Sequence, residues 1–336
     1  MGRRSDASTV ARNTILVKTG MIDPENIEQA HERIRDHTLQ TPLIRSNWLS
    51  NACSGEVYLK LENEQHTGSF KARGSLNKLM WLQEQGETSL PVTASTGNHG
   101  LGFARALDLL GMEGKIFLPE NAEPSKVNAI KDYDTELVFH GNDPYKTELH
   151  ARKTAQENGW IYVSPYNDKQ IIEGQGTIGV EIIEKLSNPD NVLATVGGGG
   201  LISGIGSYIK SASPSTKIIG CQPENSPEMA LSVRADEYKE VESKPTLSDG
   251  SAGGFEKDSI TFDLCKKLVD NFILISESEI KQAIIQMLEK HHKLIEGSAG
   301  VAVASLLKYP ERFQNKTTVI IICGANISIK KLKELL

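Results

Sequence analysis

The stretch VLATVGGGGL, residues 192–201, joins an apolar run to four consecutive glycines. The apolar run has the length and residue types of a buried strand, and we expect a helix to begin near Gly199. Consecutive glycines let backbone N–H groups converge, and the start of a helix adds partial positive charge. This strand, turn and helix therefore predict a phosphate-binding site at the end of a parallel strand.

The same order of short apolar strand, turn and helix recurs along the chain, which predicts an α/β fold of mostly parallel sheets with helices on both faces. We interpret the turn-rich stretch from Pro223 to Asp270 as a functional loop region. Strands are expected at Val57–Leu61, Pro91–Ala94, Lys115–Leu118, Glu136–Phe139, Trp160–Val163, Val192–Val196, Lys217–Gln222 and Thr318–Ile322. Helices are expected to begin near Pro24, Ser69, Asn98, Pro124, Pro144, Gly174, Gly199, Glu277 and Gly297.

The bulk properties exclude several classes of protein. The chain has 336 residues and a formal net charge of -6 without a basic stripe, so nucleic acid is not an expected partner. No apolar run approaches the roughly 20 residues that cross a membrane, and Met1 to Gly20 is interpreted as a flexible lead-in rather than a signal peptide. The four cysteines lack zinc or CxxC spacing, which favours reduced thiols in a cytoplasmic protein.

Lys71 lies in the segment TGSFKARG, residues 67–74, directly after Phe70. Most lysines are solvated surface residues, but the small neighbours here would let a flat ring approach the amine. A lysine that is desolvated near a cationic group has a lowered pKa and becomes a nucleophile. We therefore interpret Lys71 as the covalent anchor of an aldehyde cofactor whose phosphate binds at the glycine run.

A second turn, residues 94–100, contains Ser95, Thr96, Asn98 and His99. These side chains could bind a carboxylate, and the Asn98 amide could reach a phenolic oxygen of a cofactor. The alternative is that Ser95 or Thr96 caps the next helix. Capping and anion binding use the same exposed N–H groups, so both can hold. His99 is assigned no proton transfer. Cys323 either packs as a small hydrophobe or meets a ring nitrogen as a neutral hydrogen-bond partner.

A dinucleotide-binding fold is the competing interpretation of the glycine run, because Glu224 follows the next strand where a ribose-binding acid could lie. The spacing does not fit GxGxxG. Starting the motif at Gly198 puts Ser203 in the place of the third glycine, and starting at Gly197 puts Ile202 there. The run also lacks the lysine of a nucleotide-binding P-loop.

Six segments together resemble the pyridoxal-phosphate-dependent threonine/serine dehydratases. This resemblance runs from about Pro24 to the C-terminus and implies a tryptophan synthase β-like fold (PLP fold type II) with two open, twisted, mostly parallel sheets. It implies a large cofactor-binding unit of residues 1–89 and 168–336 and a small mobile unit of residues 90–167. The segments are SFKARG (69–74), STGNHG (95–100), EGQGTIGVE (173–181), VGGGG (196–200), EGSAG (296–300) and CGAN (323–326).

The resemblance also implies roles for individual residues, with Lys71 as the catalytic, Schiff-base lysine. A divalent-metal loop of relatives aligns with Gln222–Glu228, but Gln222 replaces an acidic ligand, so a cation is left open and no metal ligand is assigned. The implied cofactor-binding residues are Phe70, Lys71, Asn98, Gly197, Gly198, Gly199, Gly200, Leu201 and Cys323. The implied substrate-binding residues are Ser95, Thr96, Asn98 and His99.

The activity implied is an ammonia-lyase that removes water and then ammonia from L-threonine or L-serine and leaves a 2-oxo acid. Thr96 stands where serine racemases carry their second base, which argues against racemisation, and Tyr166 replaces an asparagine of those enzymes. A serine racemase, a hydroxyaspartate ammonia-lyase and a β-replacement synthase stay open, as do a nucleotide-dependent oxidoreductase and a silent amino-acid sensor. We expect a homodimer that binds a small amino-acid substrate.

Overall fold

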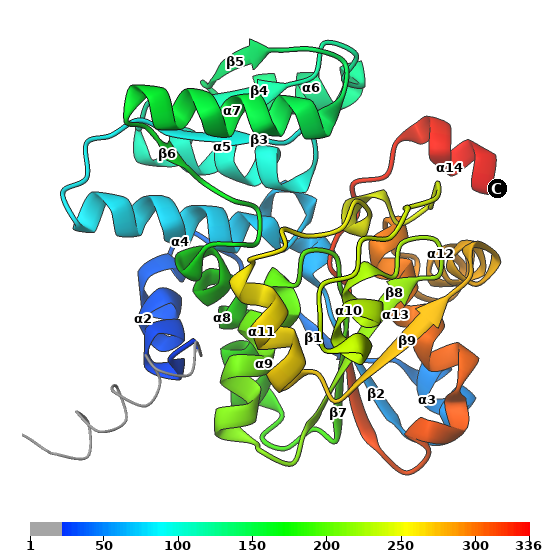
Figure 1. Ribbon diagram of the computed structural model, residues 1–336. Helices are drawn as coiled ribbons and strands as arrows, with labels where there is room; N and C mark the ends of the chain where they lie inside the picture. Colours follow the sequence, from blue (N-terminus) through cyan, green and yellow to red (C-terminus); the bar gives the residue numbers. More distant parts are fainter. Residues whose placement is uncertain (1–21) are drawn as a thin grey trace, which may run out of the picture.

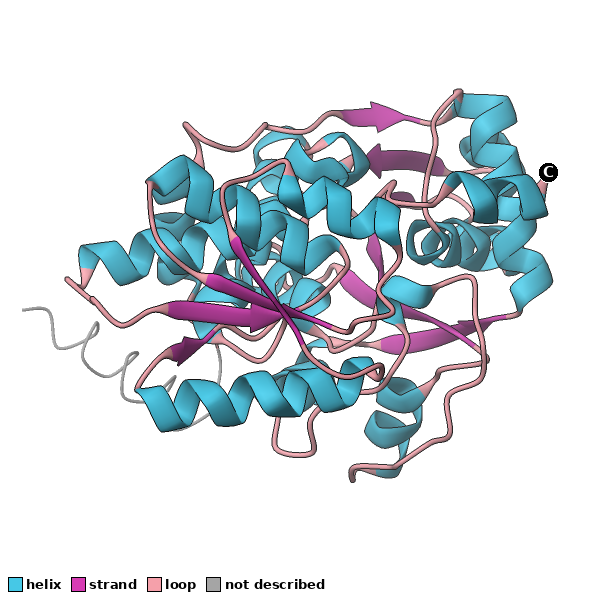
Figure 2. Ribbon diagram, turned by 90° about the horizontal axis from the view of Figure 1, so that it is seen from above, coloured by secondary structure: helices cyan, strands magenta, loops and turns pink. Residues whose placement is uncertain are grey.

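The computed structural model describes residues 22–336, in which helices surround the strands of two separate sheets (Figure 1, Figure 2). The predicted lead-in, Met1 to Gly20, lies outside these residues. None of the helices described is long and apolar enough to cross a membrane. The mixed α/β architecture predicted from the sequence is confirmed.

Strands and helices alternate along most of the described chain. The larger sheet contains β1 (Leu43–Arg45), β2 (Glu56–Lys60), β7 (Asn191–Thr195), β8 (Lys217–Pro223), β9 (Asn271–Ile275) and β10 (Thr317–Ile321). The smaller sheet contains β3 (Pro91–Ala94), β4 (Lys115–Leu118), β5 (Glu136–Phe139) and β6 (Ile161–Tyr162). The helices are α2 (Pro24–Ile34), α3 (Asn47–Cys53), α4 (Lys71–Glu84), α5 (Asn98–Leu110), α6 (Pro124–Lys131), α7 (Pro144–Asn158), α8 (Lys169–Lys185), α9 (Gly200–Ala212), α10 (Glu228–Ala235), α11 (Ile260–Leu268), α12 (Glu277–His291), α13 (Gly297–Lys308) and α14 (Ile329–Leu335).

The strand order is β1-β2-β10-β7-β8-β9 in the larger sheet and β5-β4-β3-β6 in the smaller one. Every pairing is parallel except that of β1 with β2. The smaller sheet is built from the continuous segment 91–162, and the larger sheet from the chain before and after it. The division into a fixed unit and a mobile unit with the boundaries given above stays a prediction.

Several elements differ from the sequence-based expectation. Each predicted strand is present, but β1, β9, α3 and α14 were not predicted. Helix α8 begins at Lys169 rather than near Gly174, because the Asp168 side chain accepts a hydrogen bond from the Ile171 N–H at 3.1 Å and caps the helix there. The expected loop from Pro223 to Asp270 contains α10 and α11, so its irregular part is the shorter stretch 236–259.

Four charged side chains are buried together beneath the start of α4. The Arg73 guanidinium donates to Glu62 at 2.8 and 2.9 Å and to Glu181 of α8 at 2.6 and 3.0 Å. Lys60 of β2 pairs with Glu181, and its amine donates to the Thr41 carbonyl at 2.8 Å. The four side chains are at most 2 % exposed. Two cations and two carboxylates therefore neutralise one another inside the protein.

We expect Arg73→Met to lower the free energy of unfolding by about 3–5 kcal/mol, because two buried carboxylates would lose their main partner. Urea unfolding measures this. The control is Lys153→Met, which removes the ion pair between Lys153 and Glu157. Because the Lys153 side chain is 73 % exposed, this change should lower the free energy of unfolding by less than about 1 kcal/mol. Equal effects of the two substitutions would contradict a structural role for the buried network.

Candidate active site

A cavity of about 1370 Å³ lies where loops of the two sheets meet. Every site residue predicted from the sequence lines it, although these residues come from segments far apart in the chain. They are Phe70, Lys71, Ser95, Thr96, Asn98, His99, Gly197, Gly198, Gly199, Gly200, Leu201 and Cys323. The structure thus brings the predicted residues to one place, while their individual roles stay predictions.

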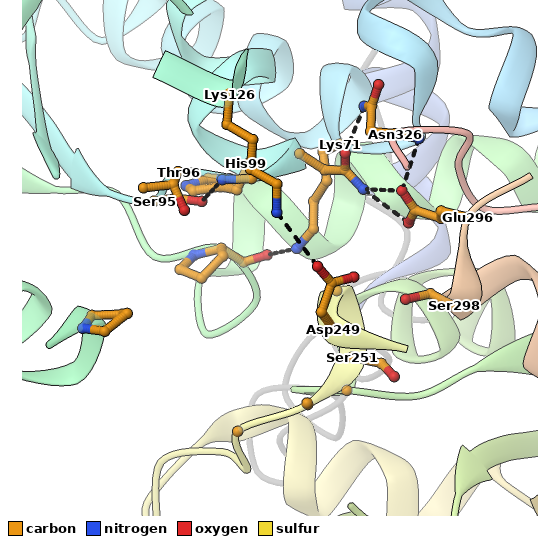
Figure 3. A pocket seen from close by; sticks show the side chains of 18 of the residues that line it. Lys71, Ser95, Thr96, His99, Lys126, Asp249, Ser251, Glu296, Ser298 and Asn326 are labelled. Carbon is orange, nitrogen blue, oxygen red and sulfur yellow. Dashed lines mark hydrogen bonds and ion pairs between the residues drawn. The ribbon is translucent and has the colours of Figure 1, made fainter. Parts of the chain in front are cut away.

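Lys71 is the first residue of α4, and its side chain enters the cavity (Figure 3). The amine donates a hydrogen bond to the Pro165 carbonyl at 2.8 Å and lies 5.2 Å from the centroid of the Phe70 ring. Burial lowers the pKa of Lys71 to about 8, against the opposing effects of Cys323 and Glu296. A substantial fraction of this amine is therefore neutral, and nucleophilic, near neutral pH.

The glycine run places the start of α9 at the cavity. Gly199 is the residue before the helix, has φ of 86° and provides no side-chain cap. The first N–H groups of a helix have no partner within it, so the amides of Gly200 and Leu201 can bind an anion. An added Cβ at Gly199 would lie 3.0 Å from Thr261 Cβ and 3.1 Å from Cys265 Sγ. Both the left-handed backbone and the packing require glycine here.

Tyr166 covers this run from the other side. A Cβ added at Gly198 would lie 2.4 Å from atoms of the Tyr166 ring. The Tyr166 hydroxyl accepts a hydrogen bond from the Glu256 N–H at 2.9 Å, which fixes the ring. The segment that receives the Lys71 amine at Pro165 therefore also packs on the glycine run.

The turn before α5 supplies the second start of a helix at the cavity. The residue before the helix is Gly97, and no side chain caps the helix, so the alternative in which Ser95 or Thr96 supplies the cap is not found. Ser95 Oγ instead accepts from the Gly97 N–H at 3.2 Å. Without a capping side chain, the N–H groups at the beginning of α5 can receive a carboxylate.

His99 is buried behind this turn. Its Nε2 lies 3.2 Å from the Val163 carbonyl oxygen, which can only accept, so Nε2 carries the hydrogen. Burial and the nearby positive charge of Lys71 lower the pKa of His99 to about 3. The imidazole is neutral at neutral pH, which agrees with assigning it no proton transfer.

Glu296 is a site residue to which sequence reasoning gave no role, although EGSAG and CGAN were recognised as motifs. Its carboxylate accepts from Asn98 Nδ2 at 3.0 and 3.1 Å and from the Asn326 N–H at 3.0 Å (Figure 3). Asn326 Nδ2 donates to Asn98 Oδ1 at 2.6 Å, which fixes the orientation of that amide. Burial raises the pKa of Glu296 to about 7. An acid followed by small residues, directly before the helix expected at Gly297, was the available signal.

Cys323 follows β10 and is 2 % exposed. Burial, and next the charge of Glu296, raise the pKa of its thiol well above the ordinary value. The thiol is therefore neutral where it lines the cavity. No residue of the loop Gln222–Glu228 lines the cavity, but the Glu228 carboxylate accepts hydrogen bonds from the hydroxyls of Ser226 and of Ser243, which does line it. No group of three or more His, Cys, Asp or Glu that could hold a metal gathers among residues 22–336.

Comparison with protein families matches residues 34–324 to the family described as pyridoxal-phosphate dependent enzyme. The chain belongs to this family. It is 38% identical over 313 residues to the L-threonine dehydratase catabolic TdcB of Escherichia coli K12, covering 93% of this chain and 95% of that protein.

Two solved structures of PLP enzymes are also similar to the chain. Threonine deaminase isoform 2 from Solanum lycopersicum aligns with a TM-score of 0.87 at 31% identity, over 93% of this chain and 88% of that one. Serine racemase from Dictyostelium discoideum aligns with a TM-score of 0.85 at 30% identity, over 92% and 99%. The fold class and the use of PLP, both implied by the sequence resemblance, are confirmed.

The residues of the cavity fit PLP. An uncapped start of a helix with a glycine backbone suits a phosphate, the desolvated Lys71 amine suits an aldehyde, and the Phe70 ring lies beside that amine. The neutral Cys323 thiol suits an uncharged ring nitrogen.

Replacing Gly199 by Ala should raise the dissociation constant for PLP by about tenfold or more, because an L side chain is strained at positive φ and meets Thr261 and Cys265. Equilibrium dialysis of the cofactor measures the change. The matched control is Gly206→Ala in the same helix, where an added Cβ would lie 3.4 Å or more from its neighbours. Similar PLP affinity in the two variants would show that the phosphate does not bind at the glycine run.

The pKa of Lys71 predicts how the cofactor-free protein takes up PLP. The neutral amine is the reactive form, so the uptake rate should rise with pH and level off above about 8, not above the ordinary lysine value of 10.5. Stopped-flow absorbance after addition of PLP measures the rate. Glu296→Gln should move the midpoint to lower pH, because the carboxylate charge raises the pKa of Lys71. A midpoint of the uptake rate near pH 10.5 would contradict the lowered pKa of Lys71.

Proposed function

We propose that the protein is an ammonia-lyase that converts L-threonine and L-serine to the corresponding 2-oxo acid and ammonia by β-elimination. The carrying observation is the desolvated Lys71 amine in one cavity with two uncapped starts of helices. The start of α9 can receive a phosphate, and the start of α5 can receive a carboxylate. The similarity to the threonine dehydratase of E. coli supports the substrate class.

Each part of the PLP molecule would be held by a different group of this chain. The N–H groups at the start of α9 would bind its phosphate, and Lys71 would form the covalent link. The Phe70 ring would pack against the cofactor ring, one N–H of Asn98 would meet the phenolic oxygen, and the Cys323 thiol would face the ring nitrogen. When bound, PLP supplies an electron sink for the α-carbon of an amino acid.

The substrate carboxylate would bind at the start of α5, between the N–H groups of the turn and the hydroxyls of Ser95 and Thr96. This contact would place the α-hydrogen within reach of the Lys71 amine. With a pKa of about 8, that amine can accept a proton near neutral pH as a general base. The Pro165 carbonyl accepts a hydrogen bond from the free amine and so holds it in the cavity.

Elimination rather than racemisation follows from the number of bases. Racemisation needs a proton donor or acceptor on each face of the α-carbon. His99 is neutral and bonded to Val163, and Thr96 carries only a hydroxyl with a methyl group that restricts χ1. Lys71 would therefore be the only strong base, and the substrate would lose its β-hydroxyl.

The assembly and location are part of the same proposal. We infer a homodimer in the cytoplasm, with residues 90–167 closing over the substrate. The reduced state of the four cysteines supports the cytoplasm, because all four are free and buried.

The purified protein should form 2-oxobutanoate from L-threonine and pyruvate from L-serine, and Lys71→Ala should lose this activity to the level of free PLP. Coupled keto-acid assays measure turnover, and chiral chromatography of the remaining substrate measures racemisation. Circular dichroism should show that Lys71→Ala stays folded, because within residues 22–336 the amine makes one hydrogen bond, to Pro165, and otherwise lies over the Phe70 ring. D-serine accumulating as fast as pyruvate would make the protein a racemase.

A further inference from the structure

Asp249 joins two lysines of different segments at the cavity. Its Oδ2 lies 3.4 Å from the Lys126 amine of α6 and 2.8 Å from the Lys331 amine of α14. Lys126 and Asp249 both line the cavity that contains Lys71 and the turn before α5. In Figure 3 the Lys126 side chain extends from the small sheet's side of the cavity to meet Asp249.

The charges around this contact are uneven. Two lysine amines share one carboxylate oxygen, and the pKa of Asp249 is lowered because the hydrogen bond from Lys331 and the charge of Lys126 outweigh its burial. Glu296 is the next carboxyl group, and its pKa is raised by burial and by Asp249. Asp249 thus occupies the position where these two amines would bind an external carboxylate.

We propose that Asp249 sets substrate specificity by occupying Lys126 and Lys331, so that the site accepts amino acids with uncharged side chains and rejects those with a β-carboxylate. The inference rests on the proposed function and narrows its substrate class. A β-carboxylate that enters the cavity would have to compete with Asp249 for these amines, because Asp249 already pairs with both of them. Without Asp249, the Lys126 amine in the cavity wall, with Lys331 close by, becomes available to bind the same group.

The test compares an L-3-hydroxyaspartate with L-threonine as substrates of the PLP-loaded enzyme. In Asp249→Asn the ratio of kcat/KM for hydroxyaspartate over threonine should rise by about tenfold or more, because the two amines lose the carboxylate that competes with the substrate for them. Asp249→Glu, which keeps the charge, should retain the parent ratio. Adding Lys126→Gln to Asp249→Asn should reverse most of the gain.

The matched control is Asp270→Asn. Asp270 also joins two lysines, Lys210 and Lys217, at 2.8 and 3.0 Å, but it does not line the cavity. This variant should leave the ratio unchanged. An unchanged ratio in Asp249→Asn, or an equal rise in Asp270→Asn, would overturn the proposal.

A binding measurement keeps the proposal testable if Asp249→Asn turns over neither substrate. L-Aspartate and L-alanine lack a β-hydroxyl, and the absorbance change of the holoenzyme on titration gives their dissociation constants. The variant should bind L-aspartate more tightly relative to L-alanine than the parent does. An unchanged relative affinity overturns the proposal. If the parent forms no 2-oxobutanoate from threonine, the proposed function fails, and this titration still decides the role of Asp249.

Discussion

The buried charge balance around Arg73 constrains the position of the reactive amine. Arg73 follows Lys71 by two residues on the first turn of α4, and its guanidinium is bonded to Glu62 and Glu181 from two other segments. A buried charge without its partner is costly, so the start of α4 is held against α8 and the end of β2. This network therefore fixes the backbone that carries the amine. Within residues 22–336 the Lys71 side chain makes a single hydrogen bond, to the Pro165 carbonyl.

Helices α5 and α9 are two of the helices that begin at the cavity without a side-chain cap, and they differ from the capped helices of the fold. The helices α7, α8 and α12 are capped by the side chains of Asp143, Asp168 and Ser276. At α5 and α9 the capping position is glycine, which has no side chain to occupy the N–H groups. The chain therefore keeps two anion sites available in the cavity that contains the Lys71 amine. This arrangement suits a ligand with two anionic groups.

The sequence predicted the fold class and the cavity-lining residues because the motifs lie at strand ends, where parallel strands gather their loops. It did not predict α10 and α11, because these short helices lie in a turn-rich context and depend on tertiary packing, of α11 against α9 and of α10 against α11. Glu296 and Asp249 were not recognised as site residues, since each depends on partners more than 100 residues away. Contacts of this kind are set by the folded topology, whereas glycine turns and caps are set locally.

The order of the larger sheet has a consequence for synthesis on the ribosome. Strand β10 pairs with β2 on one side and with β7 on the other, so the last strand in the sequence is a central strand of the sheet. Until Thr317–Ile321 emerges, β2 and β7 both present unpaired edges, which are prone to aggregation. The smaller sheet needs only residues 91–162 and can form early. The larger sheet of a nascent chain therefore keeps these two strand edges exposed until β10, its last strand in the sequence, has been synthesised.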